Sequence, residues 1–416
     1  MWRAAYRLLL WLAFPFVLAR LWWRGRHEPG YRQNIAERFG FHPTRPARPV
    51  IWLHAVSVGE TRAAEPLLRA LRSRHPDCDL LITQMTATGR EAAQQLFGGA
   101  LLVAWLPYDY PFAVRRFLRS FRPRLGILME TEIWFHLVDE CQRSGVPLLL
   151  ANGRMSAKSA RSYAAVAPLV RIALGGLSAV AAQTTEDAER LRSLGARDVE
   201  VTGNLKFDAD PSVQSESLAA QFRHRFGSRA VLLAASTREG EEELLLEALE
   251  QNALGDAILV IVPRHPQRFD TVAQLLASRG LKFIRRSTNA PLDADCDIVL
   301  GDSMGEMAAY YRACDLAFVG GSLLTYGGQN LIEACAAGVP VLIGPYTYNF
   351  AQAAESAVAA GAALRVDSAE EVIRLARSLL QDAGLRERMG KAGVAFCAAH
   401  RGATERTLAI CERLLG

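Results

Sequence analysis

The feature that most constrains the fold of this sequence is a regular alternation of short apolar runs with helical patterns. Short apolar runs between helices are typical of parallel strands that are buried on both faces of a sheet. In the first half they lie at residues 50–55, 80–84, 101–105, 125–128, 147–151 and 179–182. In the second half they lie at 230–234, 257–262, 282–284, 298–300, 316–319 and 339–343. The alternation predicts an α/β chain with two Rossmann-like, doubly wound domains.

The length of the chain also favours two domains, because 416 residues exceed the size of one ordinary domain. A polar segment, DADPSVQSES at residues 208–217, separates the two series of apolar runs. We therefore expect a first domain over residues 25–208, a linker over 209–217 and a second domain over 218–403. A helical pattern over residues 404–416 follows them.

The N-terminal segment carries an apolar run over residues 8–19, interrupted by Pro15 and flanked by arginines and tryptophans. A spanning helix needs roughly 20 apolar residues, so the run favours a segment embedded in the membrane interface over an unbroken crossing. A buried core helix is the alternative. We expect residues 1–24 to be a membrane anchor whose basic flanks keep the body on the cytoplasmic side. We also expect that removing them leaves the catalytic site intact.

The charge of the chain is concentrated at this end. Residues 1–50 contain nine arginines against Glu28 and Glu37, a net charge of +7, so the rest of the chain carries −2 of the total of +5. This distribution argues against nucleic acid as a partner and for an electrostatic anchor. The seven cysteines are scattered and none forms a Cys-x-x-Cys pair, which favours a reducing compartment.

Three carboxylates follow strands of the first half, and the carboxyl ends of strands are where ligands bind in such sheets. Ser57 and Glu60 have the spacing of a capping box, so Glu60 is either a helix cap or a general base at the mouth of the sheet. Glu130 and Glu132 follow another strand, and Lys206 lies near the expected domain junction. The pattern leaves the role of Glu60 open.

The second half carries turns at strand ends that are typical of phosphate binding. They lie at residues 234–240, at 262–266 with Arg264 and His265, at 301–307, and at 320–334 with two glycine pairs before Asn330 and Glu333. Backbone N–H groups at such turns can bind an anion, so this half is predicted to bind a nucleotide. Asp-x-Asp spacings lie in polar loops, and the sequence has no His/Cys metal-ligand set, P-loop or Gly-x-Ser-x-Gly elbow.

Eight motifs of this chain, in this order, resemble those of Kdo transferases, which add 3-deoxy-D-manno-octulosonic acid to the lipid A precursor. They are SVGE (57–60), LPYD (106–109), METEIW (129–134), LKFD (205–208), VPRHP (262–266), GDSMGE (301–306), FVGGS (318–322) and GGQNLIEA (327–334). The resemblance covers nearly the whole chain, including the apolar start. It departs at Phe135, where the family has proline, and at Gln329, where histidine is common.

The resemblance implies a GT-B glycosyltransferase of family 30, with two Rossmann-like domains facing one cleft and the acceptor domain first. It implies an inverting transfer of Kdo from CMP-Kdo to lipid IVA on the inner membrane, in contact with membrane lipids and without a metal or other cofactor. Glu60 matches the catalytic base, and Glu130 and Lys206 match positions that stabilise the transition state. The positions that match CMP-binding residues are Pro263, Arg264, Gly305, Glu306, Met307, Asn330, Leu331, Ile332 and Glu333.

Two other functions remain open on the sequence. One is another GT-B enzyme that uses a UDP-sugar, such as a cell-wall transferase or a sugar-nucleotide epimerase, although the ordered motifs argue against it. The other, from a different class, is a nucleotide-binding lipid scaffold without catalysis. The basic residues Arg154, Lys158 and Arg161 either meet phosphates of the acceptor or form a solvated helix face.

Overall fold

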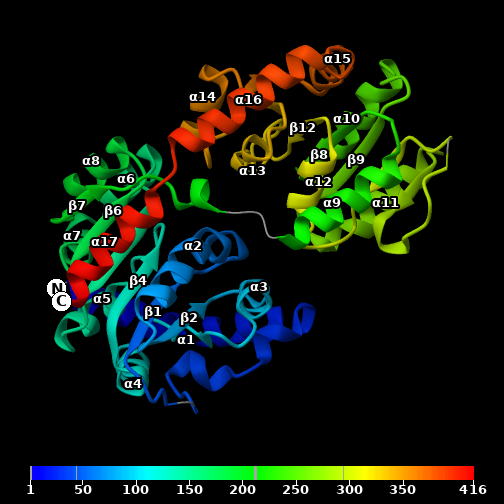
Figure 1. Cartoon of the computed structure of the whole chain (residues 1–416). Coiled ribbons are helices and arrows are strands. Elements are labelled where there is room, and N and C mark those ends of the chain that lie inside the picture. Colours follow the sequence, from blue (N-terminus) through cyan, green and yellow to red (C-terminus); the bar gives the residue numbers. More distant parts are fainter. Residues whose placement is uncertain (1, 44, 210–212, 294) are drawn as a thin grey trace. The chain divides into compact units, whose positions relative to one another are not determined.

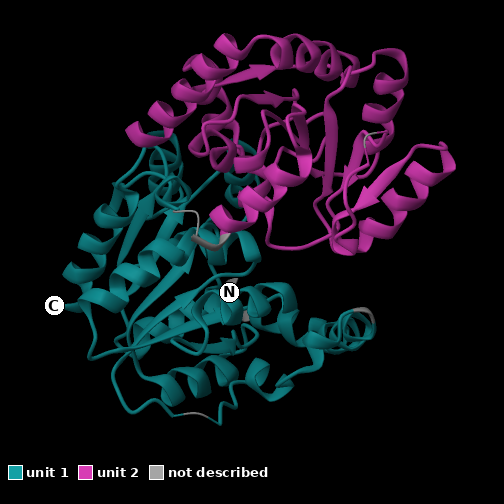
Figure 2. Ribbon diagram, turned by 45° about the vertical axis from the view of Figure 1, so that its right-hand side comes forward, with its two compact units in different colours: residues 1–209, 400–416 teal, residues 210–399 magenta. Residues whose placement is uncertain are grey.

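The structure is a computed structural model, and it describes residues 2–43, 45–209, 213–293 and 295–416. Contacts within the chain divide it into two compact units (Figure 2). The first unit comprises residues 1–209 and 400–416, and the second comprises residues 210–399. Each unit is built on one parallel sheet, so the predicted α/β fold of two doubly wound units is confirmed.

The first unit has a seven-stranded sheet in the order β3-β2-β1-β4-β5-β6-β7. Its strands are β1 (Val50–His54), β2 (Asp79–Gln84), β3 (Leu102–Trp105), β4 (Pro123–Met129), β5 (Leu148–Gly153), β6 (Ala179–Ala182) and β7 (Val199–Val201). The helices of this unit, which Figure 1 shows on both faces of the sheet, are α1 (Trp2–His27), α2 (Val58–Arg74), α3 (Ala87–Phe97), α4 (Pro111–Phe121), α5 (Phe135–Arg143), α6 (Ala157–Ala164), α7 (Ala167–Leu174), α8 (Thr185–Ser193) and α17 (Ala403–Leu415). Strand addition reverses direction between β1 and β4, which makes their carboxyl ends the topological switch point.

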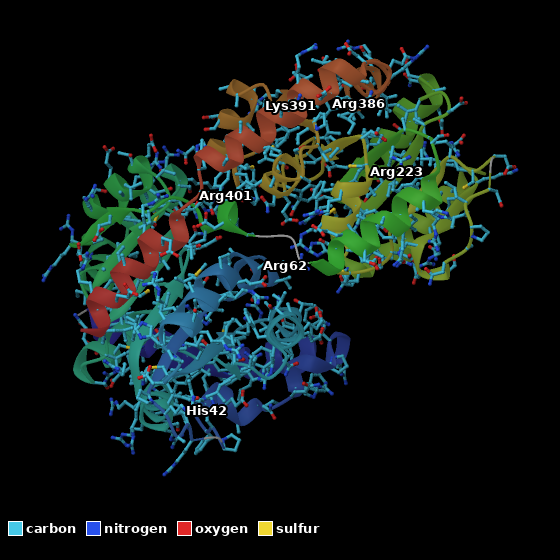
Figure 3. All side chains as sticks on the ribbon, in the orientation of Figure 1. His42, Arg62, Arg223, Arg386, Lys391 and Arg401 are labelled. Carbon is cyan, nitrogen blue, oxygen red and sulfur yellow. The ribbon has the colours of Figure 1, made fainter. Side chains whose placement is uncertain are left out.

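The second unit has a seven-stranded sheet in the order β10-β11-β9-β8-β12-β13-β14. Its strands are β8 (Val231–Thr237), β9 (Ile258–Pro263), β10 (Phe283–Arg285), β11 (Ile298–Leu300), β12 (Leu316–Val319), β13 (Val341–Ile343) and β14 (Ala363–Arg365). Its helices are α9 (Val213–Phe226), α10 (Glu241–Gln251), α11 (Phe269–Ser278), α12 (Met307–Ala313), α13 (Ile332–Ala336), α14 (Ala351–Ala359), α15 (Ala369–Gln381) and α16 (Ala383–Ala399). Arg223 on α9, labelled in Figure 3, donates hydrogen bonds to the carbonyl of Ala313 and the carboxylate of Asp315 and so ties α9 to the start of β12. The switch point lies between β8 and β12.

Every predicted apolar run coincides with a strand, and the prediction missed only β7 and β14 among the described strands. Both are three-residue strands at the edge of a sheet, and each has only one fully buried residue, Val199 and Ala363. A strand that faces solvent on one side does not need a continuous apolar run.

The N-terminal helix α1 continues through Pro15 without a break and ends at His27, beyond the predicted anchor of residues 1–24. Its segment Ala5–Arg26 contains an 18-residue window with a mean hydropathy of 1.3, of which 6% is buried, so by length and composition alone it could cross a membrane. Core helices and signal sequences satisfy the same criterion. Leu8, Leu9, Leu12 and Phe16 form an exposed apolar face on this helix.

The expected linker and second domain differ from the structure at their ends. Residues 210–212 of the predicted linker lie outside the described residues, and residues 213–217 belong to α9. The C-terminal helix α17 packs against α2 in the first unit. The chain rejoins the first unit at residue 400, directly after α16, whereas the sequence predicted that the second domain extends to residue 403. There the carboxylate of Asp208 accepts N–H groups from Gly402, at 2.8 Å, and Thr404, at 2.6 Å.

Candidate active site

The carboxylates predicted from the sequence gather at the switch point of the first sheet. Glu60 follows β1, and Glu130 and Glu132 follow β4, which is the neighbour of β1. Lys206 lies in a short 3-10 helix, Leu205–Asp208, and its Nζ is 2.8 Å from Oε1 of Glu130. The structure thus brings all four side chains to one edge of the sheet, where ligands bind in folds of this type.

Glu60 takes part in a modified capping box. The hydroxyl of Ser57 accepts the backbone N–H of Glu60 at 3.4 Å, which caps α2. The Glu60 carboxylate turns back and accepts the N–H of Val56 at 2.6 Å through Oε2, and the Ser57 hydroxyl lies 3.4 Å from Oε1. The cap of α2 therefore depends on Ser57, while the side chain of Glu60 is held over the strand end.

The surroundings of Glu60 raise its affinity for a proton. Burial raises the pKa of Glu60 to about 8. The N–H of Val56 and the charge of Lys206 oppose this rise, whereas the charges of Glu130 and Glu132 add to it. A carboxylate with a pKa near neutrality takes a proton more readily than an ordinary one, which suits general-base work near pH 8.

Glu130 is the carboxylate that stays ionised. Burial would raise the pKa of Glu130, but the charge and hydrogen bond of Lys206 and the charge of Arg154 together bring it below its usual range. The side chains of the pair are only 13% and 17% exposed. Glu130 also has a φ of 56°, an uncommon backbone conformation for a residue other than glycine. Such strained positions cluster at functional sites.

Glu132 lies beside this pair and was left open by the sequence. Burial raises the pKa of Glu132, the hydrogen bond from Trp134 lowers it, and the charge of Glu130 raises it further. The indole Nε1 of Trp134 donates to Oε2 of Glu132 at 2.8 Å. The three carboxylates thus differ in proton affinity, with Glu130 acidic and Glu60 and Glu132 basic.

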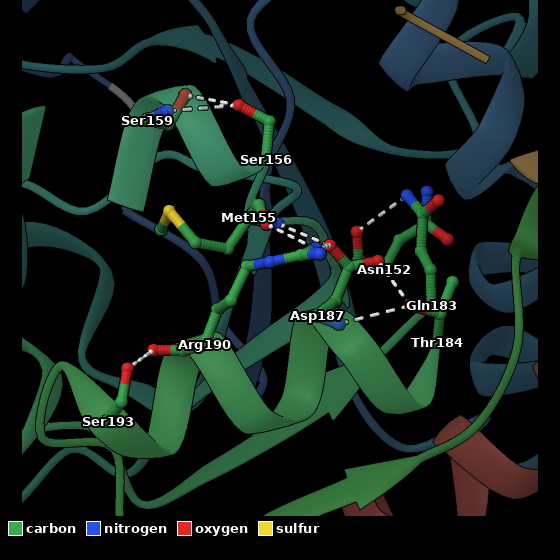
Figure 4. Close-up of polar contacts among 9 residues, drawn as sticks. All are labelled: Asn152, Met155, Ser156, Ser159, Gln183, Thr184, Asp187, Arg190 and Ser193. Carbon is green, nitrogen blue, oxygen red and sulfur yellow. Dashed lines mark hydrogen bonds and ion pairs between the residues drawn. The ribbon is translucent and has the colours of Figure 1, made fainter. Parts of the chain in front are cut away.

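Asn152 at the end of β5 helps to place Lys206. Its φ of 55° and its Oδ1, which accepts the N–H of Leu205 at 3.0 Å, fix the turn that carries the lysine. The amide of Gln183 in turn donates to the carbonyl of Asn152 at 3.0 Å (Figure 4). The same close-up shows Asp187 accepting the N–H of Met155, at 2.7 Å, which fixes the loop before α6.

The three basic residues near α6 do not share one environment. The backbone N–H of Arg154 donates to the carbonyl of Glu130 at 3.3 Å, and its charge acts on that carboxylate. Lys158 and Arg161 are exposed on α6, and within the described chain neither forms an ion pair. Only Arg154 therefore belongs to the carboxylate cluster.

In the second unit the switch point is held together by a residue that sequence reasoning missed. Glu241, at the start of α10, is fully buried. Its carboxylate accepts four backbone N–H groups, those of Arg238 at 2.8 Å, Gly321 at 2.6 Å, and Ser322 and Leu323 at 3.0 Å. The glycine-pair turn after β12, predicted to offer its amides to phosphate, thus donates three of them to the protein itself. Three consecutive acids, Glu241 to Glu243, give no sequence signal for which one binds this turn, and Glu242, which is equally buried, accepts from Thr237 and Arg268 instead.

The predicted CMP-binding residues lie at strand ends of this unit. Pro263 ends β9, and the next residue, Arg264, donates from Nε to Oε1 of Gln329 at 3.2 Å. Asn330 donates to Glu333 at 2.9 Å and accepts the N–H of Ile332 at 3.1 Å.

Two of the residues predicted to bind CMP, Leu331 and Ile332, have side chains that are buried in the core, at 0% and 1% exposure. Their side chains therefore do not lie where the prediction places a ligand. Any ligand contact they make is therefore through the backbone, and the Ile332 amide is already bonded to Asn330. Glu306, before α12, accepts from Nη2 of Arg286 at 3.0 Å and binds the hydroxyl of Ser303. Gly305 beside it has a φ of 86°, which favours glycine, and Met307 begins α12.

Among the described residues, no group of three or more His, Cys, Asp or Glu side chains is arranged to hold a metal ion.

Two protein-family models match this chain, one in each of its two units. The family model described as 3-deoxy-D-manno-octulosonic-acid transferase matches residues 33–209, and the model described as glycosyl transferases group 1 matches residues 235–395. A 3-deoxy-D-manno-octulosonic acid transferase of Bordetella pertussis is 44% identical over 100% of both chains. One from Haemophilus influenzae is 36% identical over 100% of this chain and 99% of its own.

Solved structures share the fold at low sequence identity. A glycosyltransferase from Rickettsia africae has a TM-score of 0.61, 14% identity and coverage of 89% of this chain and 99% of its own. A UDP-GlcNAc 2-epimerase from Neisseria meningitidis has a TM-score of 0.62, 16% identity and coverage of 88% and 100%. These likenesses establish the GT-B-like fold, whereas the full-length sequence relatives establish the family. The chain belongs to the 3-deoxy-D-manno-octulosonic acid (Kdo) transferase family and is a glycosyltransferase.

Proposed function

We propose that this enzyme transfers Kdo from CMP-Kdo to lipid IVA, with inversion at the anomeric carbon, on the cytoplasmic face of the inner membrane. The observation that carries the proposal is the buried Glu60 at the switch point, whose pKa of about 8 suits a general base and which lies near the Glu130–Lys206 ion pair. Membership of the Kdo transferase family supports the sugar that is moved.

In the proposed reaction Glu60 takes the proton of a hydroxyl on the lipid IVA sugar. The hydroxyl oxygen attacks the anomeric carbon of Kdo from the face opposite the phosphate. The bond between that carbon and the phosphate oxygen breaks, and CMP leaves with the bonding electrons. Lys206 supplies positive charge where negative charge develops, and Glu130, 2.8 Å from its Nζ, holds the ammonium group in place.

The second unit is proposed to bind CMP. Arg264 is suited to pair with the phosphate, and Gln329 orients its guanidinium group. Glu333, linked to Asn330, is suited to accept hydrogen bonds from ribose hydroxyls. We propose that the reaction needs no metal ion, with the cationic side chains Arg264 and Lys206 stabilising the leaving group.

The helix α1 is proposed to attach the enzyme to membrane lipids. One face of α1 packs on the first unit: the hydroxyl of Tyr110 donates to the carbonyl of Leu10 at 2.8 Å, and Phe14 contacts the ring of Phe39. The opposite face is apolar and exposed, with Phe16 at 76% exposure. A helix held along its length in this way supports insertion parallel to the interface, as its arginine and tryptophan flanks also do.

The decisive assay incubates the purified full-length enzyme with lipid IVA and CMP-Kdo and counts the added sugars by mass spectrometry. We expect CMP, but not UDP, to raise the thermal unfolding midpoint, and EDTA to leave the rate unchanged. Stabilisation by UDP alone would favour an enzyme that uses a UDP-sugar. Nucleotide binding without product, at normal membrane association, would favour a scaffold.

A further inference from the structure

Helix α1 makes one polar contact that reaches the interior of the first unit. The hydroxyl of Tyr6 donates to Oδ2 of Asp109 at 2.7 Å. The ring of Tyr6 lies 5.4 Å from that of Phe135 and 5.0 Å from that of His136, measured between ring centres. The N-terminal helix thus contacts both Asp109 and the first residues of α5.

Asp109 is the residue that caps α5. Its Oδ1 accepts the N–H of Leu137 at 2.8 Å, and its Oδ2 accepts the N–H of His136 at 3.0 Å. The N-cap residue itself, Trp134, makes no capping bond with its own side chain within the described structure. The Asp109 side chain is only 2% exposed, so its charge is compensated by these N–H groups, by the Tyr6 hydroxyl and by the amino end of α5.

The start of α5 is joined directly to the turn that carries the catalytic carboxylates. Residues 130–134 connect β4 to α5. This turn is fixed at its first end by the bond from the N–H of Glu130 to the carbonyl of Ala151, at 2.9 Å. At its other end the turn runs into the first N–H groups of α5, which Asp109 binds, and its last residue, Trp134, holds Glu132 and is the N-cap of α5. A shift of the first turn of α5 would therefore displace Trp134 and Glu132, at the end of the turn that is not tied to Ala151.

We propose that Tyr6 and Asp109 are positioning residues, through which the docking of α1 fixes the turn that presents Glu130 and Glu132. The inference rests on the proposed function, in which Glu130 holds Lys206 in place for the reaction. The N-terminal helix is then a structural part of the acceptor side of the active site as well as the membrane attachment. The contacts argue against the expectation that removal of residues 1–24 leaves the site intact, because Asp109 would lose one of its donors.

The test compares two full-length variants that each remove one hydroxyl from the same helix interface. Tyr6→Phe removes the bond to Asp109 and keeps the ring contacts. Tyr110→Phe removes the bond to the carbonyl of Leu10 and does not touch the Asp109 side chain. We expect Tyr6→Phe to lower kcat by about ten- to a hundredfold, the loss that a misplacement of about 1 Å causes. The KM for CMP-Kdo, the thermal midpoint and flotation with phosphatidylglycerol vesicles should match those of Tyr110→Phe.

A second measurement does not depend on Kdo transfer. Amide hydrogen exchange should become faster at His136 and Leu137 in Tyr6→Phe and stay at the wild-type rate in Tyr110→Phe. Equal exchange in the two variants, or an equal kcat, would overturn the coupling. A wild-type enzyme that transfers no Kdo would overturn the proposed function, and the exchange result would still decide whether α1 controls the start of α5.

Discussion

Replacing Glu60 with glutamine should stabilise this enzyme at alkaline pH while lowering the rate of transfer by orders of magnitude. Burial raises the pKa of Glu60 from 4.5 to about 8. A carboxyl whose pKa is higher in the folded than in the unfolded state binds its proton more tightly when folded. Its contribution to stability is therefore complete below pH 4.5 and is lost progressively as the pH rises to about 8. At about 1.36 kcal/mol for each pH unit, the upper limit of the loss is about 5 kcal/mol.

Glutamine keeps the shape of the protonated carboxyl and stays neutral at every pH. Its amide oxygen can still accept the N–H of Val56, which Glu60 binds at 2.6 Å. The free energy of unfolding of Glu60→Gln should therefore equal that of the wild type near pH 4.5 and exceed it at pH 9, by at most about 5 kcal/mol. Glu65→Gln is the matched control, because it removes from the same helix a carboxylate whose ion pair in the described structure is with Arg69, an exposed residue. Urea unfolding of each variant at the two pH values measures the difference.

The activity of the same variants tests the assignment of the base. Wild-type kcat should rise with pH and level off near pH 8, as Glu60 loses its proton. Glu60→Gln should lose about 10²- to 10⁴-fold in kcat, the usual contribution of a general base. The reasoning is refuted if glutamine lowers stability at both pH values, since Glu60 would then serve α2 as a cap. An inflection of kcat near pH 4.5 would contradict the effect of burial.

Two further predictions concern the buried charges at the two switch points. Lys206→Met leaves the buried Glu130 carboxylate without its partner, so at pH values above the pKa of Glu130 it should lower the free energy of unfolding by about 3–5 kcal/mol. Urea unfolding at a series of pH values should show this loss disappear as the carboxyl of Glu130 is protonated. Glu241→Ala leaves four backbone N–H groups unsatisfied and frees the turn after β12, so we expect a clear fall in thermal midpoint and in CMP affinity by calorimetry. Glu239→Ala replaces an exposed acid in the turn between β8 and α10 and should change neither.

The sequence predicted most of the fold because central parallel strands need continuous apolar runs. The exceptions, β7 and β14, are edge strands, where Glu200 and Arg365 replace apolar residues without cost to a core. The spacing of Ser57 and Glu60 could not separate a cap from a base, because both roles place the residue at the same strand end. The structure adds the burial of Glu60 by neighbours distant in the sequence, and the role of Glu60 as the base stays a prediction.

Sequence patterns were limited in the same way for the second unit, where they located strand ends but not the contacts made there. Strand-end turns correctly located Pro263, Arg264 and Asn330 at the carboxyl edge of the sheet. They could not indicate that the amides after β12 are already bonded to Glu241, because that contact joins residues about eighty positions apart. Nor could they show that the side chains of Leu331 and Ile332 face the core. Whether these positions hold CMP stays a prediction.

The return of the chain to the first unit has a consequence for how the enzyme can be taken apart. The second unit is an insertion between residues 209 and 400, so two chain segments connect it to the first. Asp208 clamps these segments together by binding the N–H groups of Gly402 and Thr404. A protease that cuts one segment leaves the two units covalently joined through the other. A simple division of the chain at the linker would remove α17 from the core of the first unit, to which its buried residues belong. Expression of the two units as separate proteins therefore requires a circularly permuted gene or a third piece that carries α17.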